Sequence, residues 1–448
     1  MGLKLYNTLT RNLEEFKPQG DVVGIYTCGL TVQGPPHVGH MRAALCRDIL
    51  VRWLEYLKYK VMTLENFTDV DDRIIEKQKA YNIDWRRIAE GNIEKYLWAC
   101  DQLNIKRASF YPRASQHIEE IITFVKKLID NGFAYQKQGD VYFRVRKFPD
   151  YGRLSKRSID ELISGARIEP TELKDDPLDF ALWKAAKPGE PYWLSPWGKG
   201  RPGWHIECSA MSTHYLGESF DIHTGGEDLI FPHHENEIAQ SVAATGKDFA
   251  RYWLHNGWVM LAGEKMSKST GHYFLIEDIL KDHSPNVIRL YMLKTQYRHQ
   301  VEFSKDRLAE VKFAYERIKI YLDKYRELPK STEPLMLNEF TASMNDDLNT
   351  AQALGVIFEL VKKGYEQEDQ NIAASIKEYL SILGFQEDED SDKGDRLSSH
   401  LIETLLDIRN KLRINKDYDL SDEIREKLKT LGIIVDDTKE SSDYRMEV

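Results

Sequence analysis

Cysteine is scarce in this chain, which has four among its 448 residues: Cys28, Cys46, Cys100 and Cys208. A disulfide-stabilised secreted scaffold would need many more, so we expect reduced thiols or metal ligands. Long apolar runs are also missing, which argues against a membrane-spanning helix. The first residues lack the apolar core of a signal peptide, and Tyr6 breaks the myristoylation pattern. We therefore expect a cytoplasmic protein without membrane contact.

An excess of positive charge is absent too. The chain carries 62 basic and 72 acidic residues, a net charge of −10. This balance argues against a protein that coats nucleic acids without specificity, although it allows local basic patches. Basic residues are crowded in segments 144–157 and 409–429. Taken alone, each segment is more typical of a solvated surface than of a binding site.

The length predicts two to four domains. An apolar, β-branched run at Val22–Thr27 predicts a strand, and a turn rich in Gly and Pro follows at 29–39. Apolar residues at helical spacing come next, before a second strand at Val61–Leu64. This order is typical of a doubly wound, parallel-sheet (Rossmann-like) α/β domain. Ligands bind at the carboxyl ends of its strands, which is where Cys28 stands.

The rest of the chain divides by composition. Residues 115–200 are rich in turns and aromatics and predict an insertion, with a strand at Val141–Val145. Sheet-like sequence resumes at Phe220–His223 and Tyr252–Leu261. Helical periodicity follows from Lys305, with an apolar stripe at Leu308, Val311, Tyr315, Ile318, Leu322 and Tyr325. We therefore expect catalytic halves at 1–114 and 201–258, the insertion at 115–200, a loop region at 259–310, an α-helical bundle at 311–385, an acidic linker at 386–396 and a small C-terminal domain at 397–448.

Two segments have the composition of phosphate-binding sites. His37-Val38-Gly39-His40 lies where the turn enters the helix, so backbone N–H groups and the positive end of the helix dipole face a ligand. Lys265 and Lys268 flank small residues in Glu264–Gly271, a cationic loop that can neutralise a leaving pyrophosphate. Either segment alone could equally be an ordinary helix start or an exposed loop.

A metal site is a further hypothesis. His233 and Glu237 are four residues apart, so on a helix they share one face. Together with Cys28 and Cys208 they would form a plausible tetrahedral zinc set. Structural zinc sites usually show closely spaced cysteine pairs, so the spacing also allows inert buried cysteines and a helix with surface acids.

One pattern is discounted. Gly198–Gly203 satisfies the dinucleotide-binding pattern G-x-G-x-x-G, but it follows Trp193–Trp197 rather than a clean strand, and Pro202 interrupts the helix that the pattern requires. We expect no nicotinamide or flavin cofactor.

His-x-Gly-His followed by Lys-Met-Ser-Lys-Ser resembles the signature pair of class I aminoacyl-tRNA synthetases, with Val38 where isoleucine is commonest. Other segments are similar to the cysteinyl-tRNA synthetases of that class: Tyr26–Gly29, Asn66–Asp72, Gly203–Ser209, Phe231–Glu237, Met344–Thr350 and Lys416–Thr438. The resemblance covers nearly the whole chain. It departs at Leu30, where proline is common among relatives. It also departs at Gln33–Pro36, where many relatives carry an aromatic residue followed by an acidic one.

The resemblance implies a ligase that activates L-cysteine with ATP and transfers it to the 3′-terminal ribose of tRNA(Cys). It implies one Zn²⁺ per chain, which reads the substrate thiolate and is held by Cys28, Cys208, His233 and Glu237. Its implied catalytic residues, acting with Mg²⁺, are His37, His40, Lys265 and Lys268. Further ATP contacts would be Gly39, Ser267 and Gly226. The cysteine pocket would include Trp204, His223, Asp228 and Thr68.

Cys46 and Cys100 match no ligand position and are expected to be packing residues. The bundle and the C-terminal module would bind the tRNA, and a monomer is expected.

Three other kinds of protein share part of this pattern. A related ligase joins cysteine to an amino-sugar inositol in mycothiol synthesis, but it needs no tRNA-binding module, whereas Leu412–Thr438 resembles the tRNA enzymes. A non-catalytic synthetase-like protein, either a cysteine sensor or a tRNA-binding module, would be expected to lack signature lysines or histidines, and all of these are present. A nucleotidyltransferase would share His-x-Gly-His without needing the zinc set or this length.

Overall fold

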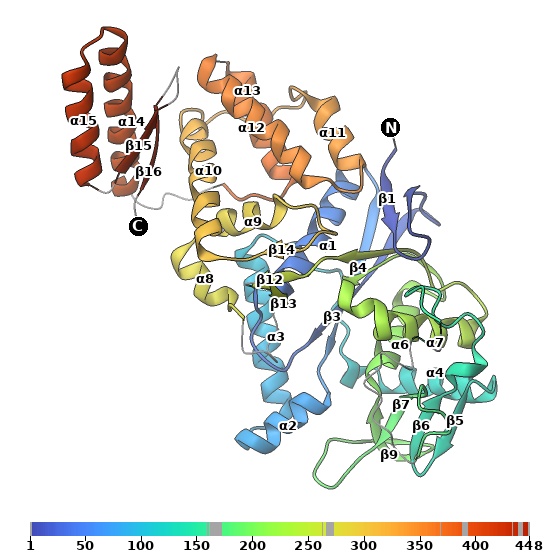
Figure 1. The fold of residues 1–448 in the computed structure, drawn as a ribbon. Helices are drawn as coiled ribbons and strands as arrows, with labels where there is room; N and C mark the ends of the chain where they lie inside the picture. The colour runs from blue at the N-terminus through green and yellow to red at the C-terminus, as the bar shows by residue number, and fades with distance from the viewer. Residues whose placement is uncertain are drawn as a thin grey trace. The chain divides into compact units, whose positions relative to one another are not determined.

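The computed structural model describes residues 2–158, 161, 173–261, 263–265, 273–367, 369–387, 393–431, 433–437 and 442–446. The chain divides into two compact units, residues 1–385 and 386–448, which are described separately (Figure 1). Of the acidic linker, residues 388–392 lie outside the described residues. Within the described part of the chain, no helix is both long and apolar enough to cross a membrane.

A four-stranded parallel sheet forms the centre of the first unit. Its order is β11 (Ala250–Asn256), β10 (Phe220–Gly226), β3 (Val22–Thr31) and β4 (Lys60–Thr68). Helix α1 (Val38–Tyr56) connects β3 to β4. The chain order reverses between β3 and β10, and ligands of doubly wound sheets bind at this switch point. The predicted Rossmann-like fold is confirmed.

Several boundaries differ from those predicted. The first two strands of the sheet are longer than the apolar runs that predicted them. The run Tyr252–Leu261 is two strands, because β11 ends at Asn256 and β12 (Val259–Leu261) belongs to a separate small sheet with β13 (Glu264–Lys265) and β14 (Val301–Glu302). Gly257 lies between β11 and β12, where the backbone of His299 approaches so closely that a Cβ on Gly257 would lie 2.5 Å from its carbonyl carbon. Glycine is therefore required at this break between the two strands.

Short elements and helices complete the catalytic region on both sides of the sheet. They are β1 (Lys4–Asn7), β2 (Asn12–Glu15), α2 (Asp72–Tyr81), α3 (Trp85–Gln102), α6 (Trp204–Leu216) and α7 (Glu235–Thr245). Asp71 and Asp84 begin α2 and α3 by accepting backbone N–H bonds from Arg73 and Arg86, as N-cap residues do.

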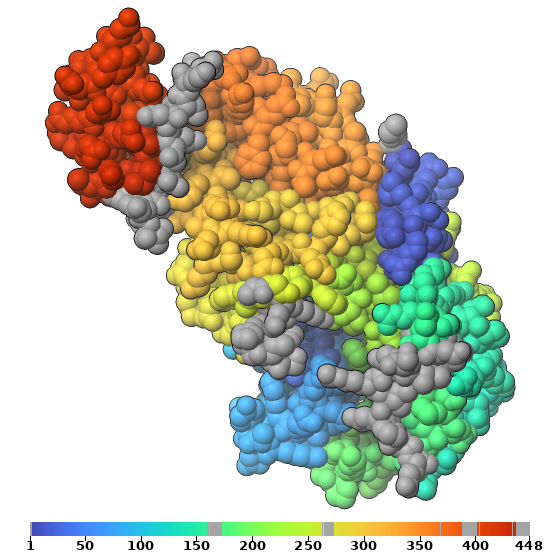
Figure 2. Space-filling view, in the orientation of Figure 1, coloured from blue at the N-terminus to red at the C-terminus, as the bar shows by residue number. Residues whose placement is uncertain are grey.

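The insertion is a five-stranded antiparallel sheet. Its order is β5 (Ala134–Lys137), β6 (Asp140–Phe143), β7 (Phe180–Ala185), β9 (Gly198–Pro202) and β8 (Trp193–Ser195), with α4 (Ile118–Asp130) preceding it in the chain. The predicted strand at Val141–Val145 corresponds to β6, which ends two residues earlier. Figure 2 shows α2 and α3 in light blue and the insertion in teal to green, with a hollow between the two lobes.

The glycine pattern at 198–203 has a packing role. Gly198–Pro202 is itself strand β9, and the segment before it contains the short strand β8, which the sequence did not predict. A Cβ on Gly200 would lie 2.2 Å from Nε1 of Trp183. Glycine at this position therefore lets the tryptophan ring pack against the sheet.

A helical region follows: α8 (Ile276–Asp282), α9 (Pro285–Leu293), α10 (Lys305–Asp323), α11 (Leu337–Asn345), α12 (Thr350–Glu366) and α13 (Gln370–Ile382). Figure 1 shows α9 to α13, in yellow to orange, on the opposite side of the sheet from the insertion. The buried stripe of α10 runs through Ile318 to Tyr321, whereas Leu322 is only partly buried. The predicted stripe therefore departs from the buried face at its end by one residue.

The second unit has its own small core. Helices α14 (Lys393–Ile414) and α15 (Tyr418–Thr430) are followed by the hairpin β15 (Ile433–Asp437) and β16 (Ser442–Met446). The side chains that pack together are Ile402, Leu406, Leu428, Ile433 and Val435.

A buried ion pair ties α1 to α9. Asp48 is fully buried and forms a salt bridge with the equally buried Arg289, and it also accepts from Arg52 at 2.9 Å. Burial alone would raise the pKa of Asp48, but Arg289 and Arg52 outweigh it and hold the pKa below its usual range. Arg289 also donates to the backbone oxygen of Leu383 just after α13, at 2.6 Å. The pair thereby joins the sheet's first helix to the bundle.

We expect Asp48→Asn to lower the free energy of unfolding by about 3–5 kcal/mol, because it leaves the Arg289 charge buried without a partner. Urea unfolding followed by tryptophan fluorescence measures this. Asp101→Asn is the control: Asp101 pairs with Arg107 on the surface, so its loss should cost no more than about 0.5 kcal/mol. Equal losses for the two variants would contradict this account.

Candidate metal centre and nucleotide site

Four side chains suited to zinc meet at the carboxyl end of the central sheet. Cys28 stands on β3, Cys208 on α6 and Glu237 on α7, and His233 lies in the short helical turn Ile230–His234 before α7. Their ligand atoms all lie within 4.8 Å of one another. The structure therefore forms a potential metal site from the four residues that the resemblance implied.

The separations fit tetrahedral coordination. The sulfurs of Cys28 and Cys208 are 3.7 Å apart, Cys208 Sγ is 3.4 Å from Nε2 of His233, and that nitrogen is 3.1 Å from Oε1 of Glu237. Tetrahedral zinc at ordinary bond lengths would hold two sulfurs about 3.8 Å apart, sulfur and nitrogen about 3.6 Å, and nitrogen and oxygen about 3.4 Å. Small adjustments would accommodate the ion.

A bulge at the end of β3 shapes the position of Cys28. The register between β3 and β4 shifts between Thr27 and Leu30. Gly29 sits inside this bulge, where a Cβ would lie 1.7 Å from the backbone oxygen of Asn66. The N–H of Gly29 donates to Oδ1 of Asn66 at 2.8 Å. Bulges re-aim side chains beside functional sites, and this one requires glycine next to the thiol.

Burial controls the charge of the cluster. It raises the pKa of Cys208 and of Glu237 well above their usual ranges and lowers that of His233 well below. At Cys28 the hydrogen bond with Cys208 lowers the pKa, but burial and Glu237 outweigh it, so the pKa is raised. Oε1 of Glu237 is buried and has no hydrogen-bond partner among the described residues. A divalent cation would supply the charge that lets the thiols and carboxyl group ionise.

Outer hydrogen bonds orient two of the ligands. Nδ1 of His233 shares a hydrogen bond with Nδ1 of His205 at 2.8 Å, which leaves Nε2 directed to the cluster. Nε2 of His223 lies 2.9 Å from Oε2 of Glu237. Such partners commonly fix ligand orientation at metal sites. His205 was missed by the sequence reasoning, although it stands three residues before Cys208.

A second row of histidines lies behind the cluster. Nδ1 of His234 is 2.8 Å from Nε2 of His255, and Nδ1 of His255 is 2.8 Å from the hydroxyl oxygen of Thr8. His234 is also 3.9 Å from Glu237. No periodic signal in the sequence connects these residues, so only the fold reveals the connection.

The residues predicted to form the cysteine pocket are arranged around these ligands. The Trp204 ring packs over His233 with centroids 4.3 Å apart and is 36% exposed, so it forms an accessible edge of an otherwise buried group. His223 stacks on Trp253. The hydroxyl of Thr68 donates to Glu207 at 2.7 Å. Asp228 lies in the turn after β10, and its Oδ1 would be 2.5 Å from a Cβ on Gly226.

The histidines that begin α1 form a defined pair. The N–H of His37 donates to Nδ1 of His40, and the N–H of Gly39 donates to Nδ1 of His37, both at 3.1 Å. The two rings stack with centroids 3.6 Å apart. Because each Nδ1 accepts a backbone proton, a neutral ring carries its own proton on Nε2. Both rings are therefore set as donors through Nε2.

The chain on either side of the lysine-containing segment is described, and the residues after it contact the start of α1. Lys265 lies on β13, where it pairs with Met260; its side chain and the residues Ser267 and Lys268 lie outside the described part of the structure. On the far side of the segment, Leu275 bridges to His37, and the N–H of Val38 donates to Phe274 at 3.1 Å. The chain that follows the lysines is thus bonded directly to the histidine turn.

The two remaining cysteines lie elsewhere. Cys100 is buried among apolar side chains, and burial, the largest influence, raises its pKa to about 12. Cys46 is partly buried against the same core. Neither is among the described residues grouped as possible metal ligands.

Comparison with known proteins gives a consistent result. A family model described as "tRNA synthetases class I (C) catalytic domain" matches residues 15–313, and one described as "DALR domain" matches residues 339–385. The chain is 46% identical to the cysteine–tRNA ligase of Persephonella marina over 98% of both chains. It is 46% identical to that of Fusobacterium nucleatum, over 99% of this chain and 100% of that protein.

Solved structures support the fold. Methionyl-tRNA synthetase of Mycobacterium tuberculosis in complex with methionyl-adenylate aligns with a TM-score of 0.60 at 15% identity, covering 81% of this chain and 90% of that one. A putative arginyl-tRNA synthetase of Campylobacter jejuni aligns with a TM-score of 0.52 at 15% identity, covering 83% and 94%. At such identities the likeness extends to the fold alone.

We expect Cys208→Ser to weaken zinc binding at least about tenfold, because a hydroxyl replaces a thiolate ligand. Metal analysis of the purified protein after dialysis against graded chelator concentrations measures this. Cys46→Ser is the matched control and should keep the wild-type zinc content, since Cys46 lies outside the cluster. Equal retention of zinc by both variants would contradict the proposed ligand set.

Proposed function

Because this chain belongs to the cysteine–tRNA ligases, a family of class I aminoacyl-tRNA synthetases, we propose how its residues divide the work of activating cysteine and charging tRNA. One observation carries the proposal. A cluster of two thiols, an imidazole and a carboxyl group and a histidine-capped helix start both lie at the carboxyl end of the central sheet, where β3 carries Cys28 and leads into α1. The first suits a thiol, and the second suits phosphate oxygens.

We propose that Cys28, Cys208, His233 and Glu237 hold one zinc ion. Bound there, zinc would supply a borderline Lewis acid with high affinity for a thiolate, and would take the substrate sulfur in that form. The ligand separations support this assignment, as does the buried Oε1 of Glu237, which forms no hydrogen bond among the described residues. As the only oxygen ligand, Glu237 would be the one to loosen when the thiolate arrives.

Side chains near the ligands would hold the rest of the amino acid. Trp204 would border the pocket, and His223 would keep Glu237 in place through its hydrogen bond. The Asp228 carboxylate would meet the substrate ammonium group, and Thr68 would line the pocket beside Glu207. Recognition of sulfur in this way would reject serine by about three powers of ten, because a steric pocket alone separates near-isosteres poorly.

In the first step, a carboxylate oxygen of cysteine attacks the α-phosphorus of ATP, the bond to the bridging oxygen breaks, and pyrophosphate leaves. Nε2–H of His37 and of His40 would donate to the phosphates, and Gly39 and Gly226 would allow their close approach. Lys265, Ser267 and Lys268 would balance the charge on pyrophosphate, with Mg²⁺ accompanying ATP. The bonds from Val38 to Phe274 and from His37 to Leu275 support a single site.

In the second step, a hydroxyl oxygen of the terminal ribose of tRNA(Cys) attacks the acyl carbon, and AMP leaves. We propose the 2′-hydroxyl, in keeping with class I. The helical bundle at 311–385 and the C-terminal module at 397–448 would hold the tRNA, the latter through exposed basic residues such as Lys427 and Lys429. Monomeric state and cytoplasmic location stay predictions.

The function is tested by transfer of labelled cysteine to unfractionated tRNA with ATP and Mg²⁺, with and without a zinc chelator. We expect charging that the chelator abolishes and that added zinc restores, together with charging by serine at least about 10³-fold slower. Cysteine-dependent ATP–pyrophosphate exchange without any charging would rule out tRNA as the acceptor. Charging unaffected by the chelator would rule out the metal.

Substitutions at His40 separate its capping role from its proposed donor role. In His40→Asn the side-chain oxygen can replace Nδ1 as the acceptor of the His37 N–H, but no donor replaces Nε2. We expect the kcat of ATP–pyrophosphate exchange to fall by about 10²–10³-fold. His40→Gln supplies an amide N–H near the Nε2 position and should recover part of that loss. Near wild-type exchange in His40→Asn, with the loss confined to His40→Gln, would argue that His40 only caps the helix.

A further inference from the structure

A buried carboxylate joins three distant parts of the first unit. Asp347 lies between α11 and α12 and is almost fully buried. It accepts from the N–H of Tyr6 at 2.8 Å, the hydroxyl of Tyr297 at 2.8 Å, Nε of Arg298 at 2.5 Å and Nε2 of Gln296 at 3.2 Å. These five residues are called the Asp347 hub below. The function proposed above gives the hub no role.

The backbone at the hub is held in an unusual conformation. Asp347 and Leu348 both have φ of 54°, in the left-handed region. Asp tolerates this region better than most residues, whereas a buried leucine rarely adopts it. The N–H of Asp347 donates to the oxygen of Lys4 at 3.0 Å, which helps to hold the turn. Consecutive residues in this conformation persist only where the surroundings fix them.

The hub is better suited to fixing position than to adding stability. Burial raises the pKa of Asp347 and outweighs its hydrogen bonds and the charge of Arg298, which lower it. The Arg298 side chain is partly exposed, so a pair in which only the carboxylate is fully desolvated contributes little net stability. Its hydrogen bonds nevertheless specify direction, because the planar guanidinium of Arg298 and the Tyr297 hydroxyl can meet the carboxylate in few arrangements.

From the hub, the chain leads directly to the lysine-bearing sheet. Residues 296–298 continue into β14, which pairs with β12, and β12 pairs with β13, where Met260 faces Lys265. The N–H of Gly257 donates to the oxygen of Tyr297, and the N–H of Val301 donates to that of Trp258, both at 2.9 Å. A shift of residues 296–298 would therefore move the strand pair that carries Lys265.

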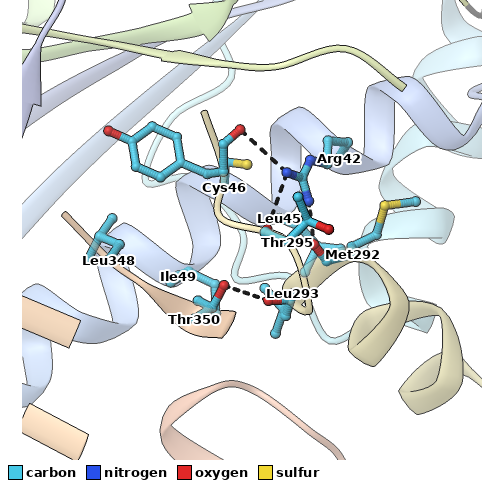
Figure 3. Close-up of a pocket in the computed structure, with 10 residues that line it drawn as sticks. Arg42, Leu45, Cys46, Ile49, Met292, Leu293, Thr295, Leu348 and Thr350 are labelled. Atoms are coloured by element: carbon cyan, nitrogen blue, oxygen red, sulfur yellow. Dashed lines mark hydrogen bonds between the residues drawn. The ribbon is translucent and has the colours of Figure 1, made fainter. Parts of the chain in front are cut away.

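The same segment is held from the other side by the helix that starts at His37. Arg42 of α1 is buried and donates to the backbone oxygens of Thr295, Gln296, Tyr297 and His299. Figure 3 shows Arg42 reaching this segment across a small pocket, and the hydroxyl of Thr350, at the start of α12, bonded to the oxygen of Leu293 at 2.7 Å. Residues 292–299 thus lie between the bundle and the proposed phosphate-binding helix.

We propose that Asp347 is a positioning residue for cysteine activation: it fixes segment 296–302 so that β13 presents Lys265 to the phosphates of ATP at the start of α1. Asp347 itself touches no substrate. The proposal rests on the function proposed above for Lys265. It implies that the bundle, beyond its proposed part in holding tRNA, is required for the step that needs no tRNA.

The test is Asp347→Asn, which keeps the shape and tolerates the left-handed backbone but removes the charge that Arg298 meets. We expect kcat/KM for ATP in pyrophosphate exchange without tRNA to fall about 10- to 100-fold, since small misplacements of catalytic groups cost this much. The KM for cysteine and the bound zinc should stay at wild-type values. Asp346→Asn, at the exposed neighbouring position, is the matched control and should behave as wild type.

A double-mutant cycle with Lys265→Ala identifies the route of the effect. If Asp347 acts through Lys265, adding Asp347→Asn to Lys265→Ala should cost less than about threefold more. Losses that multiply fully would assign Asp347 a general structural role and overturn the proposal. Tyr297→Phe, which removes only one hydroxyl group, should lower kcat/KM for ATP in the same direction by a smaller factor. If Asp347→Asn does not fold, Tyr297→Phe still tests whether the hub affects the use of ATP.

Two failures are distinguishable. Wild-type exchange in Asp347→Asn, with a large loss in Lys265→Ala, would overturn the role of Asp347 alone. Unchanged exchange in Lys265→Ala would overturn the function proposed for that lysine, and the proposal for Asp347 with it.

Discussion

Two thiols, an imidazole and a carboxyl group share a largely buried pocket, and burial disfavours the charged form of each of them. A cation is what reconciles such groups with their surroundings. This constraint organises the site. It explains why the ligands come from four different elements, why glycine stands beside Cys28 in the bulge, and why His205 and His223 are bonded to two of the ligands.

The fold brings this pocket to the nucleotide side through the connections of one strand. Cys28 stands near the end of β3, and the chain then passes through a turn into α1, which His37 caps and whose first turn contains His40. α1 is in turn fixed along its length, by Arg42 to segment 292–299 and by Asp48 to Arg289. These ion pairs and hydrogen bonds contribute orientation more than net stability, because buried charges must first recover their desolvation cost. Rigid support of this kind keeps reacting groups within the narrow range that catalysis requires.

Local sequence patterns predicted what depends on local interactions. The parallel sheet followed from apolar runs and turns, and the start of α1 from its residue types. The four metal ligands were identified from family resemblance, since their spacing alone favoured inert buried cysteines over a zinc site. The sequence did not predict β8, because three residues are too few to show alternation, or β9, because two glycines and a proline interrupt its pattern. His205, His255 and Asp347 were not predicted from the sequence because their partners lie 21 to 341 positions away, beyond any periodic signal.

Weak local signals become informative here only where the fold combines them. A histidine pair at a helix start is common, and so is a polar loop with two lysines. In this chain residues 274–275, after the loop, are bonded to the histidine turn, and the strand before it, β12, is bonded to β14. The lysine segment is therefore constrained at both ends by elements that also contact α1. Because neither end can shift without moving α1 or the bundle, the separation between the lysines and the histidines depends on packing throughout the first unit. Substitutions far from the nucleotide site, at the contacts between α1 and the bundle, should accordingly act on the chemical step.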